Sequence, residues 1–214
     1  MSLIFNALLV LLVLLNFAAL ASSRMTAMIH LTALQGVVLG LLPLILEVSN
    51  LDWTLFGLSA ATILIKALLI PSLMHRAMRE VHIRREIEPL LGFIPSLLLG
   101  AVGTGMAVVL ASTLPLGPFA DGTLIVSSSF STVLAGFIIL TTRRAAITQV
   151  AGYLILENGI YIFGLLLLDA LPFLVEVGVL LDLLVAVFVM GIILNHIQAA
   201  FSSHDTTRLS LLKE

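Results

Sequence analysis

The sequence contains no cysteine among its 214 residues and has few charged residues for its length. The lack of cysteine excludes disulfides, thiolate metal sites, cysteine-ligated iron–sulfur clusters and cysteine nucleophiles. Only 10% of the residues are charged, whereas a soluble domain carries about 25%. By contrast, 60% are hydrophobic, and the mean hydropathy is +1.21. The composition therefore predicts an integral membrane protein. No phosphate-binding loop, Ser–His–Asp arrangement or nucleic-acid-binding surface stands out.

Long apolar runs divide the chain into candidate membrane helices. A helix that crosses a bilayer needs about 20 predominantly apolar residues. Seven stretches meet this requirement, at 3–21, 27–48, 53–75, 90–113, 122–141, 146–168 and 173–197. We expect an all-α fold, a polytopic membrane helix bundle of about seven transmembrane helices.

The basic residues between these stretches all fall on one side of the predicted membrane. The loops on the opposite side carry only acidic charges, and lysine and arginine are enriched in cytoplasmic loops. We therefore expect a protein of the cell inner membrane with a periplasmic N-terminus and a cytoplasmic C-terminus. The cations assigned to the cytoplasmic surface are Arg24, Arg76, Arg79, Arg84, Arg85, Arg143, Arg144, Arg208 and Lys213.

Three ionisable residues lie deep within the predicted helices. At 1.5 Å per residue, Lys66 is roughly 15 Å from Arg76, Glu157 roughly 20 Å from Arg144, and Asp182 roughly 21 Å from the cytoplasmic end of its helix. A carboxylate at the centre of a membrane helix costs roughly 2.5–3.5 kcal/mol on insertion scales. Residues of this kind need a physical reason to be there.

Two interpretations account for the buried charges. In the first, Lys66 neutralises a carboxylate and the pair holds helices together. In the second, the charges form a proton relay, because ionisable residues inside the membrane mark ion pathways. The relay interpretation adds nearby polar side chains to the proton path, namely His30 and Gln35 on the second helix and Asn158 beside Glu157. The spacing predicts no catalytic residue, metal ligand or cofactor site.

The two halves of the chain also resemble each other. Residues 22–46 align with 141–168, so that Ser22-Ser23-Arg24 lies over Thr141-Thr142-Arg143 and Leu34-Gln35 over Leu156-Glu157. Such repeats are common in membrane transporters. The alignment predicts a parallel repeat with three parts: an N-terminal three-helix unit (1–88), a linking helix (89–120), and a second three-helix unit with a cytoplasmic tail (121–214).

The C-terminal part resembles the three-helix K subunit of bacterial complex I. The resemblance rests on the paired arginines, on GYLILENG (152–159), and on the following apolar helix with an acid and a histidine at its end. That subunit has a glutamate in each of its last two helices, both in its proton path. Glu157 matches the first by its Leu-Glu context. Asp182 matches the second in kind and depth, but not in register.

The whole chain, with its four additional helices and ILIKALLIP (63–71), resembles component E of hydrogenase-4 and formate hydrogenlyase type membrane complexes. This resemblance implies a membrane-arm subunit of an energy-converting complex related to complex I. Its partners would be antiporter-like and other membrane-arm subunits, together with a peripheral redox arm at the cytoplasmic side. The metal centres of that arm would lie on other subunits.

Three other interpretations stay open at this point. The chain could be a C-type subunit of a multisubunit cation/proton antiporter, although its four extra spans argue against that. It could be a structural scaffold whose buried charges only set helix register. A membrane-embedded enzyme is the third, but it would need a nucleophile or metal constellation that the sequence does not show. The sequence identifies neither the electron donor nor the translocated ion.

Overall fold

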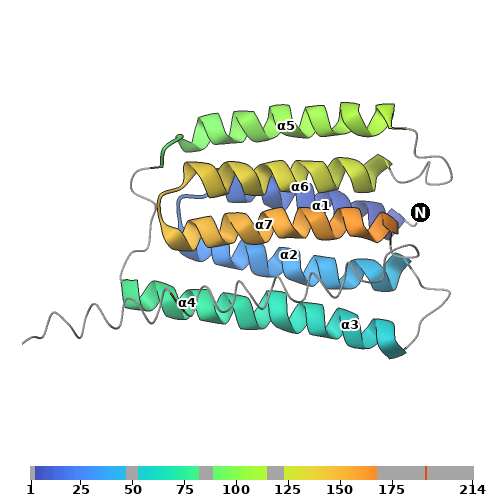
Figure 1. Cartoon of the computed structure of the whole chain (residues 1–214), viewed down its shortest axis with the longest axis horizontal. Coiled ribbons are helices and arrows are strands. Elements are labelled where there is room, and N and C mark those ends of the chain that lie inside the picture. Colours follow the sequence, from blue (N-terminus) through green and yellow to red (C-terminus); the bar gives the residue numbers. More distant parts are fainter. Residues whose placement is uncertain (1–2, 47–52, 82–88, 115–122, 168–190, 192–214) are drawn as a thin grey trace, which may run out of the picture.

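A computed structural model gives the architecture of the chain and describes residues 3–46, 53–81, 89–114, 123–167 and 191. All the regular elements in these ranges are helices, and they lie side by side in a bundle (Figure 1). Six of the helical stretches are long and apolar enough to cross a membrane. The helical membrane bundle expected from the composition is thus confirmed. The predicted seventh span, 173–197, lies outside the described residues except for Gly191.

Successive membrane-crossing stretches run in opposite directions along the bundle (Figure 1). Their bounds are α1 Leu3–Ala21, α2 Met25–Leu46, α3 Trp53–Ile63, α4 Ile70–Val81, α5 Phe93–Thr113, α6 Thr123–Thr142 and α7 Ala146–Gly164. A π-helical segment, η2 (Leu64–Leu69), joins α3 to α4, and a short 3₁₀ turn, η4 (Leu165–Leu167), follows α7. The predicted spans match these helices closely, except that α4 continues six residues beyond the predicted end at residue 75.

Two apolar clusters fill the interior, one toward each end of the bundle. The cluster at the end where α1 meets α2 includes Ala19, Ile29, Ala135 and Ile155. The cluster at the other end includes Leu12, Val38, Ile125 and Ile162. On α1, α2, α6 and α7 alike, a short interval separates the residues of one cluster from those of the other. The buried polar side chains described below lie in this interval, so they form a layer at mid-depth.

Two elements lie at the edges of the bundle, α5 on one side and α3–α4 on the other (Figure 1). The outward face of α5 is apolar and open, with Ile94, Leu98, Val102, Met106 and Val109 all more than half exposed. In a membrane protein such a face contacts lipid or neighbouring subunits. The inner four helices, α1, α2, α6 and α7, enclose most of the buried core.

The α1–α2 loop, the α6–α7 loop and the end of α4 lie at the same end of the bundle (Figure 1). Arg24, Arg76, Arg79 and Arg144 are exposed there, as expected for residues at a membrane surface.

Arg143 lies at the same end of the bundle, but its side chain turns inward. Its side chain is only 1% exposed, and its Nη2 donates to the Leu20 carbonyl at 2.8 Å. The guanidinium also lies over the Phe93 ring, 4.4 Å from the centroid. The last carbonyls of a helix such as α1 lack partners within the helix, and unsatisfied groups are costly in lipid. Arg143 therefore satisfies the end of α1 and joins it to the start of α5.

Candidate polar site within the membrane

Lys66 lies on the π-helical segment between α3 and α4, and the local sequence explains why the helix departs from α geometry. Pro71 has no backbone N–H, and in an α-helix its ring would clash with the carbonyl four residues earlier. Directly before it, the Ile70 N–H bonds to the Ile65 carbonyl, five residues back. The wider π turn accommodates the proline without breaking the membrane helix, and π turns of this kind are frequent at functional sites.

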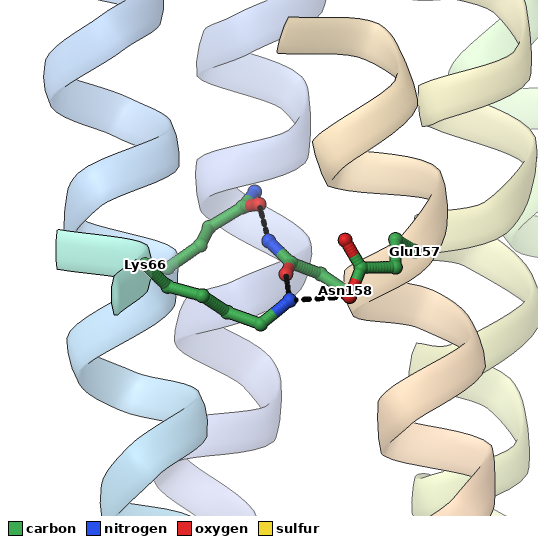
Figure 2. A network of polar contacts seen from close by, with 4 residues as sticks. Lys66, Glu157 and Asn158 are labelled. Carbon is green, nitrogen blue, oxygen red and sulfur yellow. Dashed lines mark hydrogen bonds and ion pairs between the residues drawn. The ribbon is translucent and has the colours of Figure 1, made fainter. Parts of the chain in front are cut away.

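Lys66 and Glu157 form an ion pair in the interior. The Lys66 Nζ lies 2.7 Å from Glu157 Oε1, and the two side chains are 5% and 4% exposed. Figure 2 shows the lysine side chain reaching across from α3–α4 toward α7. The residues are 91 positions apart in the sequence. The contact therefore joins the two halves of the chain, and the opposite charges neutralise each other where water is scarce.

A chain of hydrogen bonds continues from Lys66 through three amide side chains, and Figure 2 shows its beginning at Lys66 and Asn158. Lys66 Nζ also donates to Asn158 Oδ1 at 3.2 Å, and Asn158 Nδ2 donates to Gln35 Oε1 at 3.0 Å. Gln35 Nε2 then donates to Asn16 Oδ1 at 2.9 Å, and Asn16 Nδ2 to Thr132 Oγ1 at 2.8 Å. All five side chains are buried, so the chain links α3–α4, α7, α2, α1 and α6 in one layer.

The direction of this chain follows from its first member. A lysine ammonium has donors and no acceptor, so it must meet the oxygen of Asn158. The nitrogen of Asn158 then has to donate, and the same requirement passes to Gln35 and Asn16 in turn. At the far end the Thr132 hydroxyl donates to the Ser128 carbonyl at 2.6 Å. Every amide thus accepts on the side toward Lys66 and donates on the other.

Glycines let the helices approach closely enough for these contacts. A Cβ on Gly36 would lie 2.7 Å from the Lys66 Cβ, so α2 packs directly against the lysine-bearing segment. A Cβ on Gly136 would lie 2.7 Å from the Gly152 carbonyl, and it would also overlap the Leu156 backbone. Small residues commonly mediate such close helix contacts in membranes. The α6–α7 pair that carries Glu157 is therefore packed backbone to backbone.

The structure brings together four of the predicted proton-path residues, Lys66, Glu157, Asn158 and Gln35. His30 lies apart from them. It is exposed, and its ring centroid is 5.3 Å from that of His75 on α4. Asp182 lies outside the described residues.

Asn16 and Thr132 are not among the site residues predicted from the sequence. Asn16 is a single amide in the apolar run of α1, and Thr132 follows a serine-rich stretch of α6. A polar residue in the middle of an apolar span was the available signal, as it was for Glu157.

The amino-acid sequence of the chain is similar to those of several known proteins. The chain is 35% identical over 191 residues to the uncharacterized protein Rv0085 of Mycobacterium tuberculosis, covering 88% of this chain and 86% of that protein. It is 28% identical over 156 residues to hydrogenase-4 component E of Escherichia coli and of Shigella flexneri, covering 72% of each chain. No family model and no solved structure matches the chain.

The extent of the first match establishes the relationship, since it includes nearly all of both proteins. The second match is more distant but covers 72% of this chain. The protein therefore belongs to the same family of membrane proteins as Rv0085 of Mycobacterium tuberculosis, and it is a distant homologue of hydrogenase-4 component E.

Proposed function

We propose that this protein is a membrane-arm subunit of a complex I-related energy-converting complex of the hydrogenase or formate hydrogenlyase type. In this role it contributes ionisable residues to a proton or sodium translocation path, coupled to a redox reaction on other subunits. The buried ion pair of Lys66 and Glu157 carries the proposal. The distant relationship to hydrogenase-4 component E supports the assignment to such a complex.

The pair is a costly way to hold helices together. Replacing a buried ion pair with apolar residues of similar volume is often neutral or stabilising, so such a pair is weak evidence for a purely structural role. Ionisable groups that persist inside a membrane are by default candidates for an ion pathway. Glu157 and Lys66 are the titratable members of the described network, and Asn158 and Gln35 are their hydrogen-bonded neighbours.

The internal repeat is part of the proposal. Gln35 on α2 occupies the place of Glu157 on α7 in the alignment of the two halves, and Gln35 accepts a hydrogen bond from Asn158, next to Glu157. This proximity supports two three-helix units, 1–88 and 121–214, joined by a linking helix in 89–120. The second unit would correspond to the K subunit of complex I. Asp182 would be its second carboxylate.

The orientation of the bundle is also proposed. Exposed arginines gather at one end, which we assign to the cytoplasm of a cell with this protein in its inner membrane. Single cysteines at Ser203 and Ser49 of this cysteine-free chain should react with membrane-impermeant reagents from the cytoplasmic and the periplasmic side respectively. Labelling of Ser203→Cys in intact cells would reverse the assignment.

A carboxamide at position 157 tests the proton path directly. Glu157→Gln keeps the size and can still accept a hydrogen bond from Lys66, but it cannot titrate. The complex should still assemble, although at a lower yield, while proton uptake per assembled complex should be abolished or sharply reduced. Glu157→Asp should keep part of the activity, because the carboxylate survives on a shorter stem. A matched control is Thr104→Val, which removes a part-buried contact to Ser131 Oγ (2.7 Å) outside the network.

The measurement uses the affinity-tagged chain in its native membrane. Mass spectrometry of the purified complex identifies the redox subunits and hence the electron donor, and antiporter-like subunits should be among the partners. Proton uptake is then followed in sealed vesicles with that donor, alongside the yield of complex on native gels. Normal uptake in Glu157→Gln would favour the structural scaffold. Purification of a transport-competent homo-oligomer would contradict membership of a larger complex.

A further inference from the structure

The hydrogen-bond chain on the far side of Lys66 contains no titratable group. From Lys66 it passes through the amides of Asn158, Gln35 and Asn16 to the hydroxyl of Thr132. It ends on the backbone carbonyl of Ser128. A side-chain amide is a very weak base at its oxygen and a very weak acid at its nitrogen. The hydroxyl at the end is already donating to a carbonyl, so the chain offers no site where a proton from Lys66 could rest.

The same chain holds the lysine head group in place. Its direction is set at both ends, by the donor-only ammonium of Lys66 and by the backbone carbonyl beyond Thr132. The acceptor that Lys66 meets, Asn158 Oδ1, is on the residue next to Glu157. Lys66 Nζ is therefore held between two oxygens on α7, at 2.7 Å from one and 3.2 Å from the other.

We propose that Asn16 and Thr132 are positioning residues for the Lys66–Glu157 pair, acting through Gln35 and Asn158. The chain keeps the Asn158 oxygen turned toward the ammonium, and it closes the α1–α6 side of the site to protons. Proton exchange is thereby directed to Glu157. The inference rests on the proposed function, because it assigns these residues to the same proton site. It revises the expectation that Asn158 and Gln35 carry protons themselves.

Removal of the last hydrogen bond of the chain, at Thr132, should change the contacts of Lys66, because each amide in between orients the next. Without the Thr132 hydroxyl, the Asn16 nitrogen loses its acceptor, and only the bond from Gln35 Nε2 to Asn16 Oδ1 still holds the amide in its present orientation. If Asn16 turns over, Gln35 meets a donor instead of an acceptor and must turn as well. Asn158 would then present its nitrogen to the ammonium, which is a donor facing a donor. The position of Lys66 relative to Glu157 would change.

Two substitutions at position 132 separate positioning from packing. Thr132→Val is nearly isosteric and removes the hydroxyl, whereas Thr132→Ser keeps it and removes a methyl group. The readout is the carboxyl infrared band of Glu157, titrated with pH in membranes that contain the tagged full complex. The band is assigned by its disappearance in Glu157→Gln. We expect Thr132→Ser to titrate as the unsubstituted protein does, and Thr132→Val to move the midpoint by about half a pH unit or more, a threefold change in proton affinity.

Each outcome decides the inference. An unchanged midpoint in Thr132→Val, with normal accumulation of the complex, would overturn it. If Thr132→Val does not accumulate, Asn16→Leu is measured in the same way, because it cuts the chain one link earlier. Failure of both variants to accumulate would show that these side chains are needed for packing, and it would overturn their positioning role. Loss of proton uptake in Glu157→Gln together with an unchanged Thr132→Val would refute this inference and leave the proposed function standing. Normal uptake in Glu157→Gln would refute the proposed function.

Discussion

The coupling between Lys66 and Glu157 can be measured as an energy. Removing one partner of a buried ion pair costs about 3–5 kcal/mol, because the other charge is left uncompensated. Both side chains here are at least nine-tenths buried, and their atoms are 2.7 Å apart, so this range applies without a discount for solvent screening. We expect Lys66→Met and Glu157→Gln each to lower the free energy of unfolding by that amount.

The double variant should cost much less than the two single variants together. It leaves no charge in the membrane interior, and what remains lost is mainly hydrogen bonding, at about 1–3 kcal/mol. The expected coupling energy is therefore on the order of 3 kcal/mol or more. The assay is unfolding of the full chain in mixed micelles with increasing sodium dodecyl sulfate, followed by circular dichroism.

A control double-mutant cycle measures the coupling energy between two residues of this chain that do not interact. Ser112 is exposed on α5, where its hydroxyl donates to the Val109 carbonyl of its own helix at 2.7 Å. Lys66→Met and Ser112→Ala should be additive within about 0.5 kcal/mol. If Lys66→Met and Glu157→Gln were equally additive, the two residues would not interact as an ion pair in the folded protein, and the argument built on their contact would fail.

Two further predictions concern the packing around the site. Arg143→Lys should lower the free energy of unfolding by about 1.5–3 kcal/mol in the same assay, because a lysine cannot reproduce the planar contacts of the guanidinium, while the exposed Arg144→Lys should change it by less than about 0.5 kcal/mol. Equal effects at the two positions would contradict the burial of Arg143. Gly136→Ala should cost about 1–3 kcal/mol by forcing α6 away from α7, whereas Gly105→Ala, where a Cβ meets nothing within 4 Å among the described residues, should be neutral or slightly stabilising. An unchanged free energy of unfolding in Gly136→Ala would refute the close packing of α6 against α7.

The depth of the charged residues could be predicted from the sequence because helix geometry is regular. With a rise of about 1.5 Å per residue, counting from Arg76 and Arg144 places Lys66 and Glu157 near the middle of their helices. The structure agrees, since the polar layer lies between the two apolar clusters. The six described spans were predictable for a similar reason, as each is an apolar run of about the length that a bilayer requires.

The lateral contacts could not be predicted in this way. From the sequence, Lys66 could have paired with Glu157 or with Asp182, since counting residues predicts a suitable depth for both. Nothing in the sequence of a single helix tells which neighbour it faces. The π turn that carries Lys66 could not be predicted for another reason. Its sequence signal is Pro71, and a proline within a helix often causes a kink instead of a π turn.

The position of an arginine in the sequence does not predict whether its side chain is buried, as Arg143 shows. Arg143 and Arg144 are adjacent and chemically identical, and both fall in the loop between two predicted spans. The rule for membrane orientation depends on where positive charges lie along the sequence. It carries no information about the direction of each side chain. In the bundle one guanidinium turns inward to the end of α1, and the other stays at the surface.

The two partners of the ion pair are held in position by different interactions. Glu157 lies on α7, which is packed backbone to backbone against α6 at Gly136 and Gly152. Contacts of this kind allow little movement, because the atoms that would have to shift belong to the main chain. Lys66 instead reaches the site on a long side chain, and its head group is fixed by hydrogen bonds. The position of the carboxylate is therefore set by the fold, whereas that of the ammonium depends on the amide chain that ends at Thr132. A substitution in that chain should alter the pair while leaving the α6–α7 packing intact.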